Sequence, residues 1–330
     1  MASLLLFASC ANSGKKANEP FFQMRGVILS WDDIKNPDVI DWIDLMKKNG
    51  LNTISVCGHE YDDEEYYAFK QKCIDAGLDF EYEEHAMTWL LPRELFAENG
   101  VRQPDGNGCP SCQEGLEVLM SNVPEFVRTH KPTNHKYYTW LFDGGDVCHC
   151  EKCKGYNVAD QGLIFENNII KALREIDPEA QLAHLAYHNS IEAPSVVKPE
   201  EGIFLEFAPF FRTWDQPLKN KDAVGRDGKT THGEFLRMLE DNLKIFPVET
   251  AQVLDYWMDD SLYSGWKKPQ VRVPWHKDVF LSDLETYASY GIRNITAYAI
   301  YVDDYYVKAF EDISFVDDYG QGLLNYRRTE

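Results

Sequence analysis

From Met24 onward, short apolar segments alternate with longer segments that have an amphipathic helical pattern. The apolar segments have the length of buried strands, and the segments between them place apolar residues at every third or fourth position, as a surface helix does. Strands are predicted at 25–31, 52–57, 78–85, 137–142, 181–187, 203–208, 250–257 and 294–301. Helices are predicted around 39–46 and at 64–76, 116–128, 161–176, 234–245 and 279–290, and the helix after the fifth strand has the weakest pattern.

Eight strands that alternate with helices over about 300 residues predict an α/β fold of the (β/α)8 TIM-barrel class. A doubly wound open sheet is the competing arrangement. The first strand and its turn read RGVILSWDD, without the GxGxxG turn of a dinucleotide-binding fold, so we expect no organic cofactor of that kind. No repeat or linker interrupts residues 24–330, which we therefore predict to form a single barrel domain.

The first 23 residues have a different character. Leu4–Phe7 form an apolar run far too short to span a bilayer, and Ala8-Ser9-Cys10 resembles a lipobox, whose cysteine is lipidated. We therefore expect residues 1–23 to be a lipoprotein signal and tether, with Cys10 anchoring an exported protein to the membrane of the bacterial cell envelope. A disordered tail is the alternative, because no basic residue precedes the run and Phe7 stands where Leu is usual.

Composition narrows the range of partners. Lys and Arg number 33 against 54 Asp and Glu, giving a net charge of −21, so a basic stripe for nucleic acid is missing. Aromatic residues are abundant, with 8 Trp, 18 Tyr and 18 Phe. Their flat faces suit sugar rings as well as large cores.

Acidic side chains follow the predicted strands, at the end of a barrel where catalytic groups gather. Glycoside hydrolysis needs two carboxyl groups that flank the scissile bond. Asp143 follows the fourth strand and is the predicted general acid, with Asp146 as its substitute, while Asp255 of the seventh strand is the predicted nucleophile or base. Alternatively, Asp143 caps a turn and Asp255 is a buried acid paired with a Lys or Arg.

Other strand ends carry aromatic and polar groups that could bind a sugar, and Arg212 could hold the carboxylate of an acidic sugar. Taken alone, each of His59, His85 and His188 is more readily explained as a core histidine than as a ligand. Trp140 is predicted to be a core residue, and Asp259-Asp260 and Asp303-Asp304 are predicted to lie in solvated loops. The predicted substrate-binding residues are Trp31, Glu84, His85, Trp89, Tyr187, His188, Glu206, Arg212, Tyr256 and Trp257.

Five cysteines lie in two short motifs, Cys109-Pro-Ser-Cys112 and Cys148-His-Cys150-Glu-Lys-Cys153. Paired CxxC groups have the spacing of a tetrahedral zinc site. The motifs follow strands three and four, neighbours in a barrel, so their thiolates could converge. We predict a structural zinc bound by Cys109, Cys112, Cys150 and Cys153, with Cys148 or His149 as a substitute ligand. Disulfides and free thiols are the alternatives, since an exported protein meets an oxidising environment.

Three segments resemble one bacterial family, domain of unknown function 4838: His85-Ala-Met-Thr-Trp-Leu-Leu-Pro92, the stretch with Asp143-Gly144 and Cys148–Cys153, and Ala186-Tyr187. The resemblance covers most of residues 24–320. That family is grouped with the glycoside hydrolase barrels and is common in bacteria that degrade polysaccharides. The resemblance implies a glycosidase-like barrel, often exported, in which the acid after strand four corresponds to Asp143.

The leading hypothesis is an exported glycoside hydrolase-like barrel that acts on a poly- or oligosaccharide by carboxylate acid/base catalysis. Its chemistry would be retaining or inverting according to a carboxyl separation of about 5 or about 6.5–9.5 Å. A metal-dependent hydrolase, such as a deacetylase using His59, His85 and His188, is the second hypothesis. The third is a non-catalytic glycan-binding protein at the cell surface.

Overall fold

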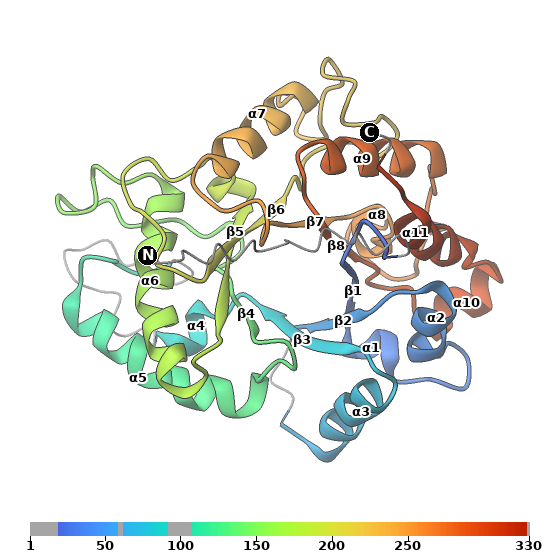
Figure 1. Cartoon of the computed structure of the whole chain (residues 1–330), viewed down its shortest axis with the longest axis horizontal. Coiled ribbons are helices and arrows are strands. Elements are labelled where there is room, and N and C mark those ends of the chain that lie inside the picture. Colours follow the sequence, from blue (N-terminus) through green and yellow to red (C-terminus); the bar gives the residue numbers. More distant parts are fainter. Residues whose placement is uncertain (1–18, 59–61, 92–106, 329–330) are drawn as a thin grey trace, which may run out of the picture.

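Eight parallel strands close into a barrel in the order β1 to β8, with β1 paired to β8, and the helices lie around this ring (Figure 1). The computed structural model describes residues 19–58, 62–91 and 107–328. The predicted TIM barrel is therefore confirmed, and an open doubly wound sheet is excluded. The strands are β1 (Met24–Ser30), β2 (Thr53–Cys57), β3 (Asp79–Glu84), β4 (Lys136–Thr139), β5 (Gln181–Tyr187), β6 (Ile203–Ala208), β7 (Gln252–Asp255) and β8 (Asn294–Tyr298).

The observed strands match the hydrophobic pattern best where the barrel ladder is longest. β5 and β6 have the predicted bounds, whereas β4 ends at Thr139 and β7 spans only four residues. Beyond β4 the chain stays apolar but leaves the regular ladder, and the amide of Trp140 donates to the carbonyl of Glu84 at 2.8 Å. The apolar run therefore continues for three residues after the strand ends. These residues lead into the loop that carries Asp143.

Most crossovers contain a helix at the predicted place, and further short helices lie in the loops. The helices are α1 (Trp31–Ile34), α2 (Trp42–Asn49), α3 (Glu64–Asp75), α4 (Met87–Leu90), α5 (Gln113–His130), α6 (Val158–Ile176), α7 (His232–Leu243), α8 (Asp260–Tyr263), α9 (Lys277–Ser289), α10 (Asp304–Phe310) and α11 (Ser314–Asn325).

The crossover from β5 to β6 contains only a short 3-10 helix, η3 (His188–Ser190), which explains the weak helical pattern there. The segment that follows contains Pro194 and Pro199, which disfavour a continuous helix. Asp160 of α6 fixes this segment instead. Its carboxylate accepts backbone N–H bonds from three consecutive residues, Ser195, Val196 and Val197, at 2.8–3.0 Å.

The barrel interior below the strand ends is polar. The Tyr138 hydroxyl donates to Gln252 at 3.1 Å, and Gln252 donates to Glu206 at 3.1 Å. Burial raises the pKa of Glu206 to about 8, and it raises the pKa of the fully buried Glu83 well above its usual range. Both acids therefore favour their protonated form, Glu206 within a hydrogen-bonded group and Glu83 without a hydrogen-bond partner in the described structure.

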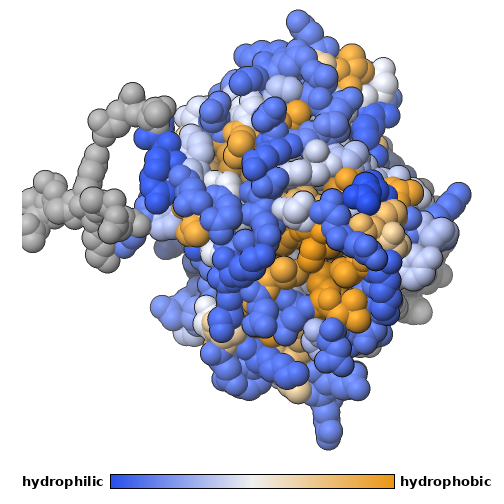
Figure 2. Space-filling model, turned by 90° about the vertical axis from the view of Figure 1, so that its right-hand side faces the viewer, coloured by the Kyte–Doolittle hydropathy of each residue, from blue (hydrophilic) through white to orange (hydrophobic). Residues whose placement is uncertain are grey.

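A shallow hollow beside α2 is lined by four apolar and three charged side chains. Val39, Ile40, Leu45 and Ile313 line it, and apolar side chains gather on this face of the molecule (Figure 2). Within the described ranges, no helix combines the length and apolar character that a bilayer crossing requires.

Most of the predicted signal and tether, including Cys10, lies outside the described residues. Lipidation and export therefore stay predictions.

Candidate active site

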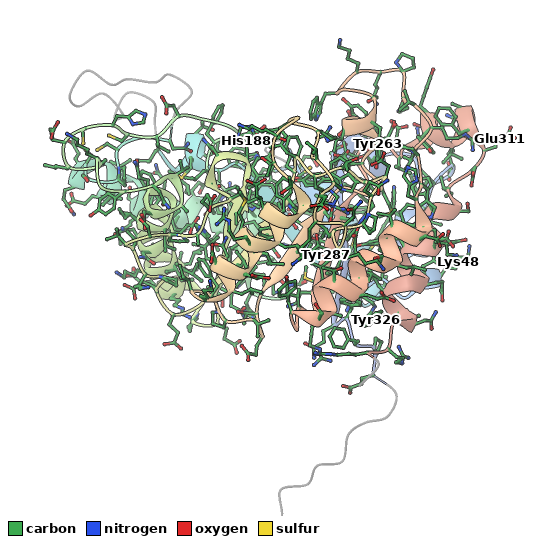
Figure 3. The ribbon with its side chains drawn as sticks, turned by 90° about the horizontal axis from the view of Figure 1, so that it is seen from above. Lys48, His188, Tyr263, Tyr287, Glu311 and Tyr326 are labelled. Carbon is green, nitrogen blue, oxygen red and sulfur yellow. The ribbon has the colours of Figure 1, made fainter. Side chains whose placement is uncertain are left out.

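A pocket of about 630 Å³ opens at the carboxyl-terminal end of the barrel. Two carboxylates line it, Asp143 after β4 and Asp259 after β7. Figure 3 shows His188, another lining residue, near the upper edge of the molecule, with Tyr326 at the opposite edge. The pocket thus lies where a TIM barrel carries its chemistry.

A tight turn carries Asp143. The amide of Gly145 donates to the Phe142 carbonyl at 3.0 Å, and Gly144 adopts φ +59°, a left-handed conformation that favours glycine. The Asp143 side chain is exposed to the pocket, where it hydrogen-bonds to Tyr187. Burial, together with the charge of Asp143, raises the pKa of the Tyr187 hydroxyl, so that Tyr187 stays a donor.

Asp259 lies in a very different environment, although it belongs to the same pocket. It is 4% exposed, and its carboxylate accepts a 2.6 Å hydrogen bond from the Ser261 hydroxyl. Burial raises the pKa of Asp259 to about 7, although the Ser261 bond acts in the opposite direction. Two carboxyl groups of one pocket, one exposed and one buried, are the arrangement that separates the roles of acid and base.

The prediction that Asp259 and Asp260 lie in a solvated loop was wrong, because both are buried. The apolar side chains of Met258 and Leu262 on either side are buried too, and they draw the intervening acids inward. Of the second predicted loop pair, Asp303 is buried and forms a 2.9 Å ion pair with Lys268, whereas Asp304 is half-buried and pairs with Lys308.

Two predicted histidines line the pocket, His85 from the loop after β3 and His188 directly after β5. The His85 Nδ1 contacts the Leu141 carbonyl, which can only accept, so Nδ1 carries the proton and Nε2 is left as an acceptor. His188 has φ +48°, an uncommon conformation for a residue with a side chain. Strain of this kind concentrates at functional sites. His85 and His188 are thus brought together with Asp143, as the sequence predicted.

Asp255 does not line the pocket. Successive residues of a strand face opposite sides, and Leu254 and Tyr256 line the pocket, so Asp255 faces the surrounding helices. The Arg212 Nε lies 3.2 Å from its carboxylate, and the Tyr287 hydroxyl of α9 donates to it at 2.8 Å. In Figure 3, Tyr287 lies well below His188, away from the pocket end.

Arg212 is therefore committed elsewhere and cannot hold an acidic sugar. It is 0% exposed and also contacts Asp283 at 2.5 Å. Trp257 belongs to the same buried group, because its indole N–H donates to Asp283 at 3.0 Å. The geometry favours the alternative in which Asp255 is a buried acid paired with arginine.

Among the other predicted residues, Tyr187 and Tyr256 line the pocket. Glu206 lies below it and accepts the indole N–H of Trp140 at 2.8 Å. Glu84 is half-buried, and its carboxylate accepts the backbone N–H of His85. Asp146 is exposed, with His149 Nε2 at 3.0 Å, and is not a lining residue.

The other two tryptophans that were predicted to bind substrate lie apart from the pocket. Trp31 is buried against Tyr66 and Phe69. Trp89 lines a separate hollow of about 450 Å³, together with Arg128. His59 lies outside the described residues.

Sequence reasoning missed several aromatic lining residues. Trp140 was predicted to be core, and its ring is buried, but it also forms part of the pocket wall. Phe210, Trp266 and Tyr298 also line the pocket. Phe210 follows β6 and Tyr298 ends β8, so a strand-end position was their available signal, but the strand bounds were too uncertain to separate lining residues from core. Trp266 comes after α8 and had no such signal.

Four cysteines converge beside the pocket. The sulfur atoms of Cys109, Cys148, Cys150 and Cys153 lie within 4.8 Å of one another, with Cys109 3.9 Å from Cys150 and 3.7 Å from Cys153. Cys148, the predicted substitute, takes the place of Cys112, which instead precedes the first turn of α5. The cluster joins the loop after β3 to the loop after β4 and could bind a metal ion such as zinc.

The thiols of the cluster differ in acidity, because burial raises the pKa of Cys109 and of Cys148. The described cysteines form no disulfide. Burial acts to raise the pKa of Cys150, but hydrogen bonds from the Cys153 backbone and the neighbouring thiols outweigh it and lower the pKa to about 7. No other set of three His, Cys, Asp or Glu ligands converges in the described ranges.

Residues 14–307 match the family described as Domain of unknown function (DUF4838). The chain belongs to this family. The family resemblance drawn from the His85–Pro92 and Cys148–Cys153 segments is thus confirmed. A search of curated proteins gave no match.

Solved structures place this DUF4838 barrel beside glycoside hydrolases in fold. A GH5-4 broad-specificity endoglucanase from an uncultured bacterium superposes with a TM-score of 0.51 and 8% identity, covering 89% of this chain and 86% of the other. An O-GlcNAc hydrolase mutant from Thermobaculum terrenum gives 0.46 and 14%, covering 92% of this chain and 63% of the other. An endo-β-1,4-mannanase from Thermotoga petrophila gives 0.43 and 10%, covering 92% and 77%. At such identities the likeness shows the fold alone.

Proposed function

We propose that this protein is a glycoside hydrolase that uses Asp259 as general acid and Asp143 as nucleophile or base. The observation that carries the proposal is that one pocket brings together an exposed carboxylate and a buried one. A buried carboxyl with a pKa of about 7 keeps a proton available for the leaving group at neutral pH. The acid role thus moves from Asp143, where the sequence placed it, to Asp259.

The remaining lining groups fit a sugar ring. His85 Nε2 can accept a bond from a sugar hydroxyl, and so can the Tyr187 oxygen, whose own proton is donated to Asp143. Tyr256 and Tyr298 stack with ring centroids 5.3 Å apart and add an apolar surface. Metal-dependent hydrolysis is less well supported, because in the described part of the chain only cysteines form a metal-ligand group.

A panel of glycosides tests the proposal directly. The purified protein is incubated with neutral, N-acetylated and uronic aryl glycosides and oligosaccharides, and released reducing sugar is measured. We expect hydrolysis of at least one class, and loss of that hydrolysis in both Asp143→Asn and Asp259→Asn. Hydrolysis that survives both substitutions would refute the assignment, and binding without any turnover would favour a glycan-binding protein.

The pH dependence of the reaction should report Asp259. Because the acid must be protonated, kcat/KM is expected to fall as the pH rises through about 7, by about tenfold per pH unit beyond it. The Ser261 hydrogen bond lowers the pKa of Asp259, so Ser261→Ala should shift the alkaline decline of kcat/KM to higher pH. A pH profile of both proteins provides the test, and a decline that stays in place in the variant would contradict the acid role.

We further propose that the four-cysteine cluster binds a structural zinc ion. Four thiolates close a tetrahedral coordination sphere and leave no open position for substrate. Cys148, Cys150 and Cys153 follow Asp143 in the same loop, and Cys109 ties that loop to its neighbour. Bound zinc would therefore hold the rim that carries Asp143.

Metal analysis separates a zinc site from the alternatives. The wild type is expected to contain about one zinc per chain, and Cys153→Ser should lose most of it and melt at a lower temperature. Cys112→Ser is the matched control, since Cys112 lies outside the cluster, and it should keep its zinc. A metal-free wild type with fewer titratable thiols than cysteines would instead indicate disulfides.

A further inference from the structure

Trp266 is a large exposed aromatic side chain at the pocket. It is 59% exposed and lines the same pocket as Asp143 and Asp259. Tryptophan is highly buried on average, so a solvent-exposed indole at the edge of a pocket indicates a ligand-binding surface. Its neighbour Phe210 lies 6.2 Å away between ring centroids, tilted by 33°.

The backbone holds this indole in place. Trp266 has φ +57° directly after Gly265 at φ +66°, and its amide donates to the Ser261 carbonyl at 2.6 Å. Two successive left-handed residues form a tight turn that a side chain rarely adopts. Such strained positions concentrate at ligand-binding sites. A preset backbone also reduces the entropy lost when a ligand stacks on the ring.

An aromatic wall connects Trp266 to the pocket interior. Phe210 lies between Trp266 and Tyr256, with its ring centroid 5.3 Å from that of Tyr256. Arg226 supports Phe210 from another side, because its guanidinium lies 5.3 Å from that ring and its NH2 group donates to the Phe210 carbonyl. The wall runs from buried Tyr256 to exposed Trp266, and so from the pocket interior to solvent.

The charge of the pocket restricts the sugars that this wall would bind. Two of the described lining residues are carboxylates, and none is Lys or Arg. Arg212 is paired with Asp255 and Asp283. Arg226 is packed over Phe210 and Trp214 and is not a lining residue. A substrate carboxylate would therefore be repelled by Asp143, whereas a neutral sugar would not.

We infer that Trp266 stacks on a second sugar unit, next to the one held between Asp143 and Asp259. The substrate is then a chain of neutral sugars and not a single-sugar glycoside. This inference rests on the proposed hydrolase function. Stacking of the apolar face of a sugar on an indole is the same kind of contact that aromatic rings make in protein interfaces.

Chain-length dependence tests the inference. The kcat/KM of a neutral trisaccharide is divided by that of the matching glycosyl fluoride, which offers only one sugar ring. Trp266→Ala is expected to lower this ratio about tenfold, and Trp266→Phe should restore most of it. Tyr305→Ala, an exposed aromatic of α10, is the matched control and should leave the ratio unchanged. An unchanged ratio in Trp266→Ala would overturn the inference.

A binding measurement separates this inference from the hydrolase proposal. Neutral and uronic oligosaccharides are titrated into Asp143→Asn, with and without Trp266→Ala, by calorimetry. Neutral-chain binding that weakens about tenfold without Trp266 supports the inference, and if the wild type then shows no hydrolysis, the hydrolase proposal alone fails. Tighter binding of the uronic chain, or binding indifferent to Trp266, would overturn the inference whatever the activity.

Discussion

Replacing Asp143 with asparagine is expected to lower kcat/KM for glycoside hydrolysis by about 10³-fold. The amide keeps the size of the side chain and can still bond to Tyr187, but it cannot attack a sugar or take a proton from water. Initial rates on the best substrate of the glycoside panel would measure the loss. Asp259→Asn should cause a comparable loss and, in addition, remove the decline in rate above neutral pH.

Asp146→Asn is the matched control for this result. Asp146 lies three residues further along the same loop, but it is exposed and pairs with His149 outside the pocket. We expect it to keep most of the activity, with circular dichroism confirming that all variants fold. The assignment would fail if Asp143→Asn stayed within tenfold of the wild type, or if Asp146→Asn lost as much.

Removing the Asp255 carboxylate is expected to destabilise the protein by about 3–5 kcal/mol. Asp255→Ala would leave the buried guanidinium of Arg212 beside a single remaining acid, Asp283. The Trp214 indole, which donates to Asp255 at 2.7 Å, and the Tyr287 hydroxyl would also lose their acceptor. Urea unfolding followed by tryptophan fluorescence would measure the change in the free energy of unfolding.

A half-buried acid near the surface provides the comparison. Asp241 pairs with Arg237 and Lys244 on α7, and Asp241→Ala should cost at most about 1 kcal/mol. The double variant Asp255→Ala with Arg212→Met should recover part of the loss, because no unpaired charge stays buried. A stable Asp255→Ala protein without hydrolase activity would contradict this structural role and return Asp255 to the catalytic role predicted from the sequence.

The contrast between Asp143 and Asp255 shows what strand patterns can predict. The alternation of apolar strands and helices was enough to predict the barrel. Asp143 lies just beyond a strand end, in a loop that reaches the rim whichever way the last strand residue faces. Asp255 is the last residue of β7, where successive side chains alternate between the barrel interior and the surrounding helices. With strand bounds uncertain by two residues, the sequence did not decide which way the Asp255 side chain faces. The tertiary contacts with Arg212 decide it.

The cysteine motifs and the Asp259-Asp260 pair illustrate a second limit. Spacing predicted that two cysteine motifs would meet, but whether Cys112 or Cys148 turns toward the others depends on where α5 begins. Charge alone predicted solvent for Asp259, yet the burial of Met258 and Leu262 decided its place. Both outcomes depend on packing between distant segments, which periodicity along one segment does not encode.

The acids buried in the barrel also affect how the whole protein exchanges protons with its surroundings. The formal charge of −21 treats every carboxyl group as ionised. Burial, however, raises the pKa of Asp33, Asp259 and Asp260 to about 7 and that of Glu206 to about 8. Between the ordinary carboxyl pKa of about 4 and these values, the folded chain binds protons that the unfolded chain releases. These four groups therefore make unfolding near pH 6 acidify an unbuffered solution, and their contribution to stability declines as the pH rises from about 4 to about 8.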